Sequence, residues 1–364
     1  MKVMHFHFGK DGGAERFFVH LVNALARRNV VQKVIIRPDR IWRKEIEHSA
    51  EITESHFRNA SLGRILLPLH VKRTARRWKP DALFAWMPRA SRLMPRHAGC
   101  IRIARLGDYP VRLNYFKNID VLVCNTPGIG EHVKAMGWPR RIEVISNFTR
   151  TEQVVPVDRK VLDTPDDVRL ISSMGRFVPR KGFDVLIRAV AQMDDTFLWI
   201  IGDGEQSKNL HALARQLGVE NRVRFAGWQA DPRPFVAASD VFAMASSHEP
   251  LGNVLLEAWA QRVPVVSTRC EGPMWFVRHE ENALFVDIGD HEGFAQAITR
   301  VLDSPGLAGT MVAGGSKTLA DKFSEEAVAN AYMELFASHT EPVPACPYRK
   351  VKPGWPAEPR RAAG

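Results

Sequence analysis

Residues 169–190 read RLISSMGRFVPRKGFDVLIRAV, and this stretch indicates the fold class most clearly. Arg169 to Met174 is a short β-rich run of the kind that forms a buried strand. Four apolar residues then repeat at helical spacing, namely Val185, Leu186, Ala189 and Val190. Because a glycine-containing loop joins the two segments, the stretch predicts one strand–loop–helix unit of a parallel α/β sheet.

The same alternation of apolar runs and helix-period segments continues along most of the chain. In the first half the candidate strands are Val3 to Phe8, Lys33 to Arg37, Asp81 to Met87, Ile101 to Leu106, Val121 to Asn125 and Ile142 to Ser146. In the second half they are Arg169 to Met174, Phe197 to Ile201, Val223 to Ala226, Val241 to Ala245, Pro264 to Ser267 and Ala283 to Asp287. We therefore expect an α/β protein with two parallel sheets, one in each half.

The length of 364 residues, with 45% hydrophobic content, suits about two domains. Residues 149–165 are polar, contain two prolines and lack periodicity, so they predict a linker. We predict an N-terminal domain over 1–155 and a C-terminal domain over 156–340, whose last helix returns to the first domain. Residues 341–364 are rich in proline and cations and predict a disordered tail.

The net charge of +11 is unevenly distributed, since residues 1–155 carry +15 and residues 156–340 carry −7. A basic half indicates contact with a phospholipid surface, a phosphorylated glycolipid or a nucleic acid, although solubility alone also explains it. A nucleic acid is disfavoured, because the cations lack the interleaved aromatic residues of a known binding module.

Residues 62–79 read LGRILLPLHVKRTARRWK and combine aliphatic residues with five cations near their end. This composition is typical of a helix at an anionic membrane interface, and it equally fits a covering helix with a solvated basic end. The sequence has no apolar run long enough to span a bilayer and no apolar signal core. We therefore expect a cytoplasmic protein, at the inner face of the membrane.

Two loops have the composition of anion sites. Gly9 to Glu15 joins the first strand to the first helix, where free N–H groups and glycines allow a phosphate to approach; any tight turn also favours glycine. The loop Gly175 to Gly182 places Arg176 and Lys181 at the carboxyl edge of the second sheet, where open α/β sheets bind ligands. The arginine fork and the lysine charge suit a pyrophosphate.

Residues 249–260, EPLGNVLLEAWA, form a third constellation, in which Gly252 and Asn253 begin an apolar helix. The free amides at this helix start can hold a phosphate, and Glu249 lies just ahead of them. Glu257 follows Glu249 eight residues later and is surrounded in the sequence by apolar residues. A carboxylate there needs hydrogen-bond donors, and two ribose hydroxyls would supply them.

These motifs together resemble the retaining glycosyltransferases of family 4, which have the GT-B fold. The resemblance rests on Gly-Arg-x5-Gly at 175–182, Gly-Asp-Gly-Glu at 202–205, Arg-Val-Arg-Phe-Ala-Gly-Trp at 222–228 and Glu-x7-Glu from Glu249 to Glu257. It covers about residues 3–335 and is strongest in the second half. It implies two Rossmann-like domains that face each other across a donor/acceptor cleft, with the nucleotide sugar bound by the second domain.

The resemblance also implies a role for each motif residue. Arg176, Lys181 and Glu249 would be the catalytic residues, with the two cations neutralising the donor pyrophosphate. The donor-binding residues would be Gly12, Gly13, Gly175, Leu251, Gly252, Asn253, Val254 and Glu257, the last on the ribose. Residues 222–228 would lie near the nucleobase. We expect no metal and no cofactor, since the sequence lacks Asp-x-Asp and cations can stabilise the leaving diphosphate.

The first half departs from the family pattern at the end of one strand. Many members have a histidine near the reacting sugar, where this chain has Trp86 or Met87. The polar candidates for the acceptor site are Arg89, Arg105 and Asp108, with His5 and His7 as alternatives. A histidine on a strand is more often a satisfied core residue.

The leading hypothesis is a retaining glycosyltransferase that moves a sugar from a nucleotide diphosphate to an anionic, lipid-linked or lipopolysaccharide-type acceptor. A sugar-nucleotide epimerase of related fold would leave the basic first half unexplained. A non-catalytic sugar-nucleotide-binding protein would not need Arg176, Lys181, Glu249 and Glu257 together.

Overall fold

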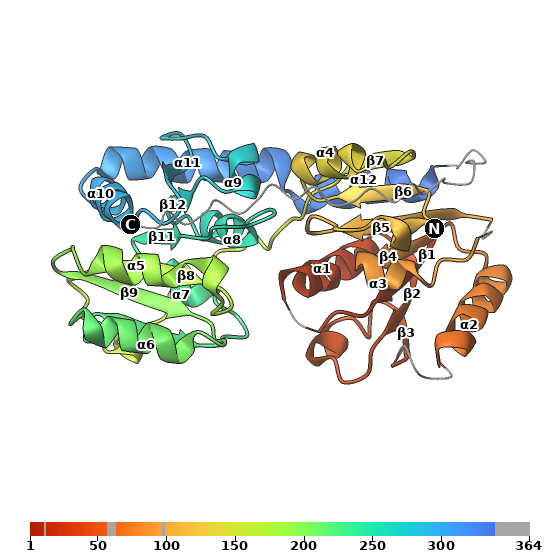
Figure 1. Cartoon of the computed structure of the whole chain (residues 1–364), viewed down its shortest axis with the longest axis horizontal. Coiled ribbons are helices and arrows are strands. Elements are labelled where there is room, and N and C mark those ends of the chain that lie inside the picture. Colours follow the sequence, from red (N-terminus) through yellow and green to blue (C-terminus); the bar gives the residue numbers. More distant parts are fainter. Residues whose placement is uncertain (11, 57–62, 97–98, 339–364) are drawn as a thin grey trace, which may run out of the picture. The chain divides into compact units, whose positions relative to one another are not determined.

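The computed structural model describes residues 1–10, 12–56, 63–96 and 99–338, which form two compact units (Figure 1). Of these residues, 1–10, 25–144 and 334–338 belong to the first unit, and 12–24 and 145–333 to the second. The predicted tail over 341–364 lies outside the described residues. In the described part of the chain, no helix is both long and apolar enough to cross a membrane.

The first unit contains a seven-stranded parallel sheet in the order β3-β2-β1-β4-β5-β6-β7. The strands are β1 (Lys2–His7), β2 (Val31–Ile36), β3 (Glu51–Glu54), β4 (Ala82–Trp86), β5 (Ile101–Leu106), β6 (Val121–Cys124) and β7 (Arg141–Val144). The strand order reverses between β1 and β4, which makes the carboxyl ends of these strands the topological switch point.

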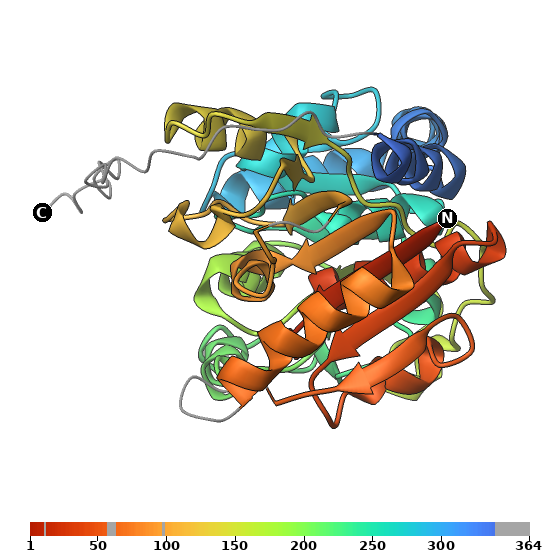
Figure 2. The ribbon, with the colours of Figure 1, turned by 90° about the vertical axis from the view of Figure 1, so that its right-hand side faces the viewer.

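Helices α2 (Gly63–Trp78), α3 (Met87–Ser91) and α4 (Pro127–Ala135) belong to this unit, with short 3-10 turns at Ile41–Glu45 and Asn114–Phe116. Figure 2 shows α2 lying across β1 and β2. Leu67, Val71 and Ala75 form its buried side and pack in one cluster with Met4 and Ile35. The helix is therefore a covering helix of the sheet on one side.

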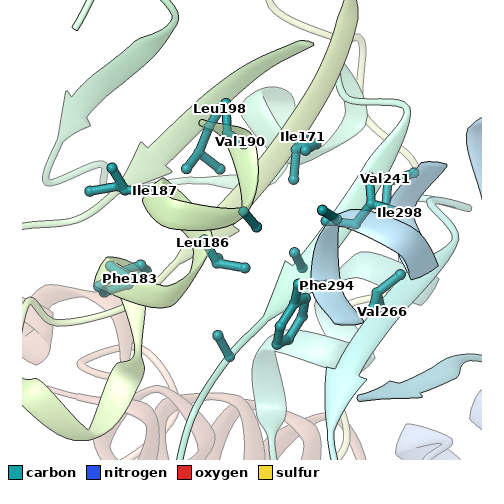
Figure 3. Close-up of a cluster of buried hydrophobic side chains, with 14 of the residues drawn as sticks. Ile171, Phe183, Leu186, Ile187, Val190, Leu198, Val241, Val266, Phe294 and Ile298 are labelled. Carbon is teal, nitrogen blue, oxygen red and sulfur yellow. The ribbon is translucent and has the colours of Figure 1, made fainter. Parts of the chain in front are cut away.

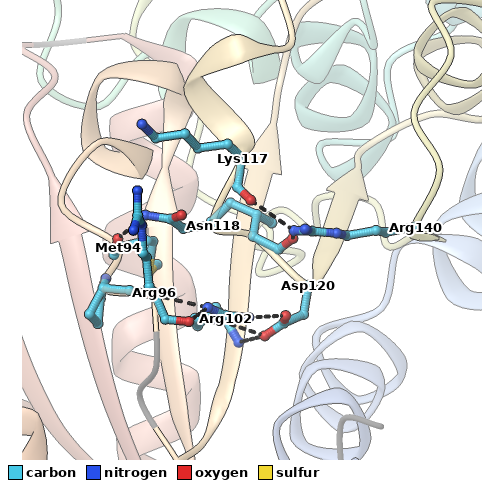
Figure 4. A network of polar contacts seen from close by, with 9 residues as sticks. Met94, Arg96, Arg102, Lys117, Asn118, Asp120 and Arg140 are labelled. Carbon is cyan, nitrogen blue, oxygen red and sulfur yellow. Dashed lines mark hydrogen bonds and ion pairs between the residues drawn. The ribbon is translucent and has the colours of Figure 1, made fainter. Parts of the chain in front are cut away.

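A polar network fixes the amino ends of β5 and β6 (Figure 4). Both the backbone N and Nε of Arg102 donate to Oδ2 of the buried Asp120, at 2.9 and 2.8 Å. Asn118 Nδ2 donates to the carbonyl of Met94 at 2.7 Å, and Arg140 Nη1 donates to that of Lys117 at 3.0 Å. These contacts brace the edge of the sheet opposite the carboxyl ends.

The second unit contains a six-stranded parallel sheet in the order β10-β9-β8-β11-β12-β13. The strands are β8 (Arg169–Met174), β9 (Thr196–Ile201), β10 (Val223–Gly227), β11 (Val241–Met244), β12 (Val265–Thr268) and β13 (Leu284–Val286). The main helices are α5 (Phe183–Val190), α6 (Ser207–Gln216), α7 (Arg233–Ala237), α8 (Asn253–Ala260), α9 (Glu271–Phe276), α10 (His291–Leu302), α11 (Pro305–Lys322) and α12 (Glu325–Ala337), whose residues from 334 onward belong to the first unit.

Helices cover both faces of this second sheet. On one face, Leu186 of α5 and Phe294 of α10 pack against Ile171 and Val241 of the central strands (Figure 3). On the other face, α8, α9 and the end of α11 form a separate core around Trp259. The strand order reverses between β8 and β11, so the carboxyl ends of these two strands flank the switch point.

The observed sheets confirm the predicted α/β class with one parallel sheet per half, and each candidate strand coincides with an observed one. The strand that sequence analysis missed is β3 (Glu51–Glu54), whose side chains are exposed or half-buried. An edge strand that buries little apolar surface has no hydrophobic run to reveal it.

The segment predicted as a linker is held along the second unit. Val154 N donates to Gln261 Oε1 at 3.0 Å, and Val157 N donates to the carbonyl of Pro234 at 3.0 Å. Arg159 Nη2 lies 3.0 Å from Asp240 Oδ1. These bonds make residues 154–159 part of the second unit's surface, while the predicted boundary at residue 155 stays a prediction.

Candidate active site

The carboxyl end of β8 leads directly into the predicted cation loop. Arg176 is exposed, and Lys181 ends the 3-10 turn Pro179–Lys181. A side chain at Gly175 would meet Lys181, whose Cε lies 3.2 Å from the position of a Cβ there. The absence of a side chain at Gly175 therefore lets the lysine stem cross the end of the strand.

Lys181 forms an ion pair with Glu249. Lys181 Nζ lies 2.6 Å from Glu249 Oε2, and the two side chains are only 14% and 17% exposed. Residue 182 fixes the loop, because it has φ +65° and a Cβ on it would lie 2.1 Å from the carbonyl oxygen of Ala245, at the end of β11. Glycine is the residue that meets both demands, so the lysine is held at the switch point.

The start of α8 is open to a ligand. Gly252 precedes the helix with φ +94°, Asn253 is its first residue, and no side chain caps it. The first N–H groups of a helix have no partner within it and carry partial positive charge. Behind this turn, Gly272 packs so closely on Leu251 that a Cβ there would lie 2.5 Å from backbone atoms of that residue. The turn is therefore tightly held.

The start of α1 (Gly13–Arg27) lies beside the same residues within the second unit. A Cβ on Gly12 would lie 3.2 Å from Glu15 Oε2 and 3.7 Å from Arg176 Nη2. A Cβ on Gly13 would lie 3.0 Å from Asn253 Nδ2. Two helix starts and Arg176 thus converge, and the glycines leave room for an anion to approach.

Glu257 lies in the second turn of α8 and is partly buried. Burial raises the pKa of its carboxyl group to about 7, with opposing contributions from the cations Arg150, Lys181 and Arg233. Arg233 Nη2 also binds Asp231 Oδ2 at 2.6 Å. A buried carboxylate is destabilised unless it accepts hydrogen bonds, and a ligand hydroxyl could donate one here.

The structure therefore brings the residues of the three predicted motifs to one edge of the second sheet, with Val254 next to Asn253 in the helix start. Trp228 follows β10 at the same edge and is 56% exposed. Three further residues belong to none of the predicted motifs and reach the site only through the fold. Asn147 hydrogen-bonds to Asn253, and Asp231 and Arg233 lie near Glu257.

In the first unit, Arg89, Arg105 and Asp108 all lie at the carboxyl ends of β4 and β5. Arg89 and Asp108 are exposed, whereas Arg105 is buried opposite Trp86, with its guanidinium 5.4 Å from the centre of the indole ring. The three residues gather at the edge where an α/β sheet binds ligands, and their role in acceptor binding stays a prediction.

The two histidines of β1 are buried and neutral. Trp86 Nε1 donates to His5 Nδ1 at 3.3 Å, and His5 Nε2 lies 3.1 Å from Gln32 Oε1. Burial lowers the pKa of both His5 and His7 to about 3. The bonding of His5 is that of a satisfied core residue.

A family model described as glycosyl transferases group 1 matches residues 154–318. Over 338 residues the chain is 64% identical to the lipopolysaccharide core biosynthesis glycosyltransferase LpsE of Rhizobium meliloti (strain 1021), covering 93% of this chain and 99% of that one. The chain belongs to the glycosyl transferases of group 1. This glycosyltransferase is also 52% identical over 336 residues to LpsD of the same organism, again a lipopolysaccharide core biosynthesis glycosyltransferase.

Among solved structures, HepE of Anabaena in complex with UDP and glucose is similar to the glycosyltransferase with a TM-score of 0.81. The two sequences are 23% identical, and the match covers 93% of this chain and 99% of that one. The likeness confirms the predicted GT-B fold with its two parallel-sheet α/β domains. The predicted enzyme class, a glycosyltransferase, is confirmed by the family and by the LpsE relative, in place of the epimerase and non-catalytic alternatives.

Proposed function

We propose that this glycosyltransferase moves a sugar from a nucleotide diphosphate to an anionic glycan of the lipopolysaccharide core or its lipid-linked precursor. The observation that carries the proposal is the convergence of the α8 start, the α1 start, Arg176 and Lys181 at the switch point of the second unit. Each of these groups favours a negative charge. Together they suit a diphosphate rather than a single phosphate.

The donor is bound by its diphosphate and its ribose. Arg176 and Lys181 neutralise the phosphates, the amides at Asn253 and Val254 take the distal phosphate, and Glu257 accepts hydrogen bonds from the ribose. The UDP and glucose bound by the HepE structure support a uridine nucleotide as the first donor to test. The enzyme needs no metal in this proposal, because two cations and two helix starts supply the positive charge.

Transfer proceeds with retention, in keeping with the resemblance to family 4. The bond from the anomeric carbon to the diphosphate oxygen breaks, and its electron pair leaves with the diphosphate. The acceptor hydroxyl forms the new bond on the same face of the sugar and gives its proton to the departing oxygen. Lys181 and Arg176 stabilise the charge that develops on this oxygen, and Glu249 holds the transferred sugar.

The acceptor is anionic and binds the first unit. The net charge of +15 over residues 1–155 supports this assignment, as do the LpsE and LpsD relatives, which are lipopolysaccharide core biosynthesis glycosyltransferases. Arg89, Arg105 and Asp108 supply polar groups at the carboxyl edge of the sheet.

The outward side of α2 supports contact with an anionic membrane. Leu66 and Leu69 are each 58% exposed, and the cations Lys72, Arg73, Arg76 and Arg77 are exposed further along the helix. Leu66, Leu69, Arg73, Arg76 and Arg77 lie on the side opposite the buried Leu67, Val71 and Ala75, as the helical period requires. Leucines and cations on one exposed side are typical of a helix in an anionic lipid interface.

Vesicle sedimentation tests the membrane contact. Replacing Arg73, Arg76 and Arg77 together by Ser is expected to abolish binding to vesicles with acidic lipid, while transfer to a soluble acceptor fragment stays near that of the wild type. The matched control replaces Arg188, Lys208 and Arg215, which are exposed in α5 and α6, by Ser and removes the same charge. Equal binding to neutral vesicles, or binding that is insensitive to salt, would contradict the proposal.

A transfer assay tests the activity itself. UDP-sugars and GDP-sugars are offered with an isolated lipopolysaccharide core acceptor, and the anomeric configuration of the product is determined by NMR. We expect one nucleotide series to react, with retention, in the presence of EDTA. An inverted product would contradict the retaining mechanism, and loss of activity in EDTA would contradict metal independence.

A further inference from the structure

Asn147 and Asn253 are joined by a side-chain hydrogen bond. Asn147 Nδ2 donates to Asn253 Oδ1 at 2.7 Å, and Asn147 is only 3% exposed. Asn147 lies shortly after β7, near the start of the segment 145–333 of the second unit, whereas Asn253 is the first residue of α8. Because a carboxamide accepts through its oxygen and donates through its nitrogen, this bond sets the direction in which the Asn253 side chain faces.

The bond occupies the carbonyl oxygen of Asn253, the first residue of α8. The N-cap position itself is taken by Gly252, which has no side chain with which to cap the first turn. The Asn253 oxygen is thus held by Asn147, which leaves its amide nitrogen as the group that can face a ligand.

The same bond directs the amide nitrogen of Asn253 to the other side. Asn253 Nδ2 lies 3.0 Å from the position of a Cβ on Gly13, at the start of α1. The nitrogen carries two N–H donors, and it stands where the two helix starts and Arg176 converge. It is thus placed to donate to a phosphate or sugar oxygen.

We propose that Asn147 is a positioning residue for the donor site. It holds the Asn253 oxygen and turns the Asn253 amide nitrogen toward the distal phosphate or the transferred sugar. The inference rests on the proposed function, since that function supplies the phosphate. Asn147 lies outside the sequence motifs that resemble family 4.

Calorimetric titration with UDP and with GDP tests the inference. Asn147→Ala is expected to weaken binding of the preferred nucleotide about tenfold, because the Asn253 side chain loses the bond that sets its direction. Asn147→Asp is expected to weaken it further, since a carboxylate can only accept and would pull the Asn253 nitrogen away from the ligand. Asn253→Ala should lower the affinity similarly, and the Asn147→Ala, Asn253→Ala double variant should be no worse than either single one.

Kinetics and unfolding separate positioning from a merely structural role. The donor KM should rise in Asn147→Ala while the acceptor KM and the thermal midpoint stay near the wild type. Asn209→Ala, which removes an exposed asparagine of α6, is the control and should change none of these. Additive losses in the double variant, or an unchanged nucleotide affinity in Asn147→Ala, would overturn the inference. Failure of the wild type to bind either nucleotide would instead contradict the proposed function.

Discussion

Lys181 Nζ and Glu249 Oε2 lie 2.6 Å apart at the switch point of the second sheet, with both side chains largely shielded from water. In this arrangement each charge neutralises the other before a donor arrives. A diphosphate brings two further negative groups, so it competes with Glu249 for the lysine. In the proposed function, binding of the donor would thereby free the carboxylate for the hydroxyls of the transferred sugar.

Removing either phosphate cation is expected to lower the turnover number strongly. We expect Lys181→Ala and Arg176→Ala each to reduce it by roughly 10²-fold, the scale known for a lost transition-state stabiliser, with the fold retained. Arg180→Ala is the matched control, because this exposed cation lies in the same loop. Steady-state kinetics with normal activity in both variants would reject the donor-site assignment.

Glu257 in α8 and Glu249 in the turn before it are expected to affect different kinetic constants. Glu257→Ala should mainly raise the donor KM, since the ribose loses its acceptor. Glu249→Ala should mainly lower kcat, because the proposed function has this carboxylate hold the transferred sugar and because Lys181 loses its partner. Initial-rate measurements with the donor varied distinguish the two effects. The reverse pattern would mean that the roles are exchanged.

Protonation of Glu257 should make the free energy of unfolding depend on pH. Its pKa is raised from 4.5 to about 7 in the folded protein, so the folded state holds more protons than the unfolded state between these values. The free energy of unfolding therefore falls as the pH rises through this window and levels off beyond it. Relative to Glu257→Gln, the loss should be on the order of 2 kcal/mol, reduced by partial solvent contact. Urea titrations at pH 5 and pH 8 measure it, and parallel behaviour of the two proteins would contradict it.

Gly182 is expected to be far less tolerant of a side chain than Gly218. Both have positive φ, at +65° and +67°, but a Cβ on Gly182 would lie 2.1 Å from the Ala245 carbonyl oxygen, whereas Gly218 has nothing within 4 Å. Gly218→Ala should cost about 1 kcal/mol for the left-handed backbone alone. Gly182→Ala should cost about 3 kcal/mol or more, because the loop must move as well. Chemical denaturation compares the variants, and equal losses would show that the loop is not tightly held.

Apart from strand β3, the strands of both sheets and the loop motifs could be predicted from the residues alone. Strand β8 and helix α5 are visible in residues 169–190, because hydrophobic periodicity and glycine turns are local properties of the chain. The motif residues Arg176, Lys181 and Glu249 were found in the same way, since each belongs to a loop that follows a strand. The carboxyl ends of parallel strands lie at one edge of the sheet, so the loops that follow them come together even when they are far apart in sequence.

Only the tertiary structure decided the pairings. No local pattern connects Asn147 with Asn253, or Lys181 with Glu249, and their bonds exist because strands and helices far apart in the chain end at one point. The edge strand β3 could not be predicted for a related reason. Its side chains are exposed or half-buried, so it forms by pairing with β2 and has no apolar pattern of its own. Burial likewise set the pKa of Glu257, a property of the surrounding fold that the identity of a residue does not reveal.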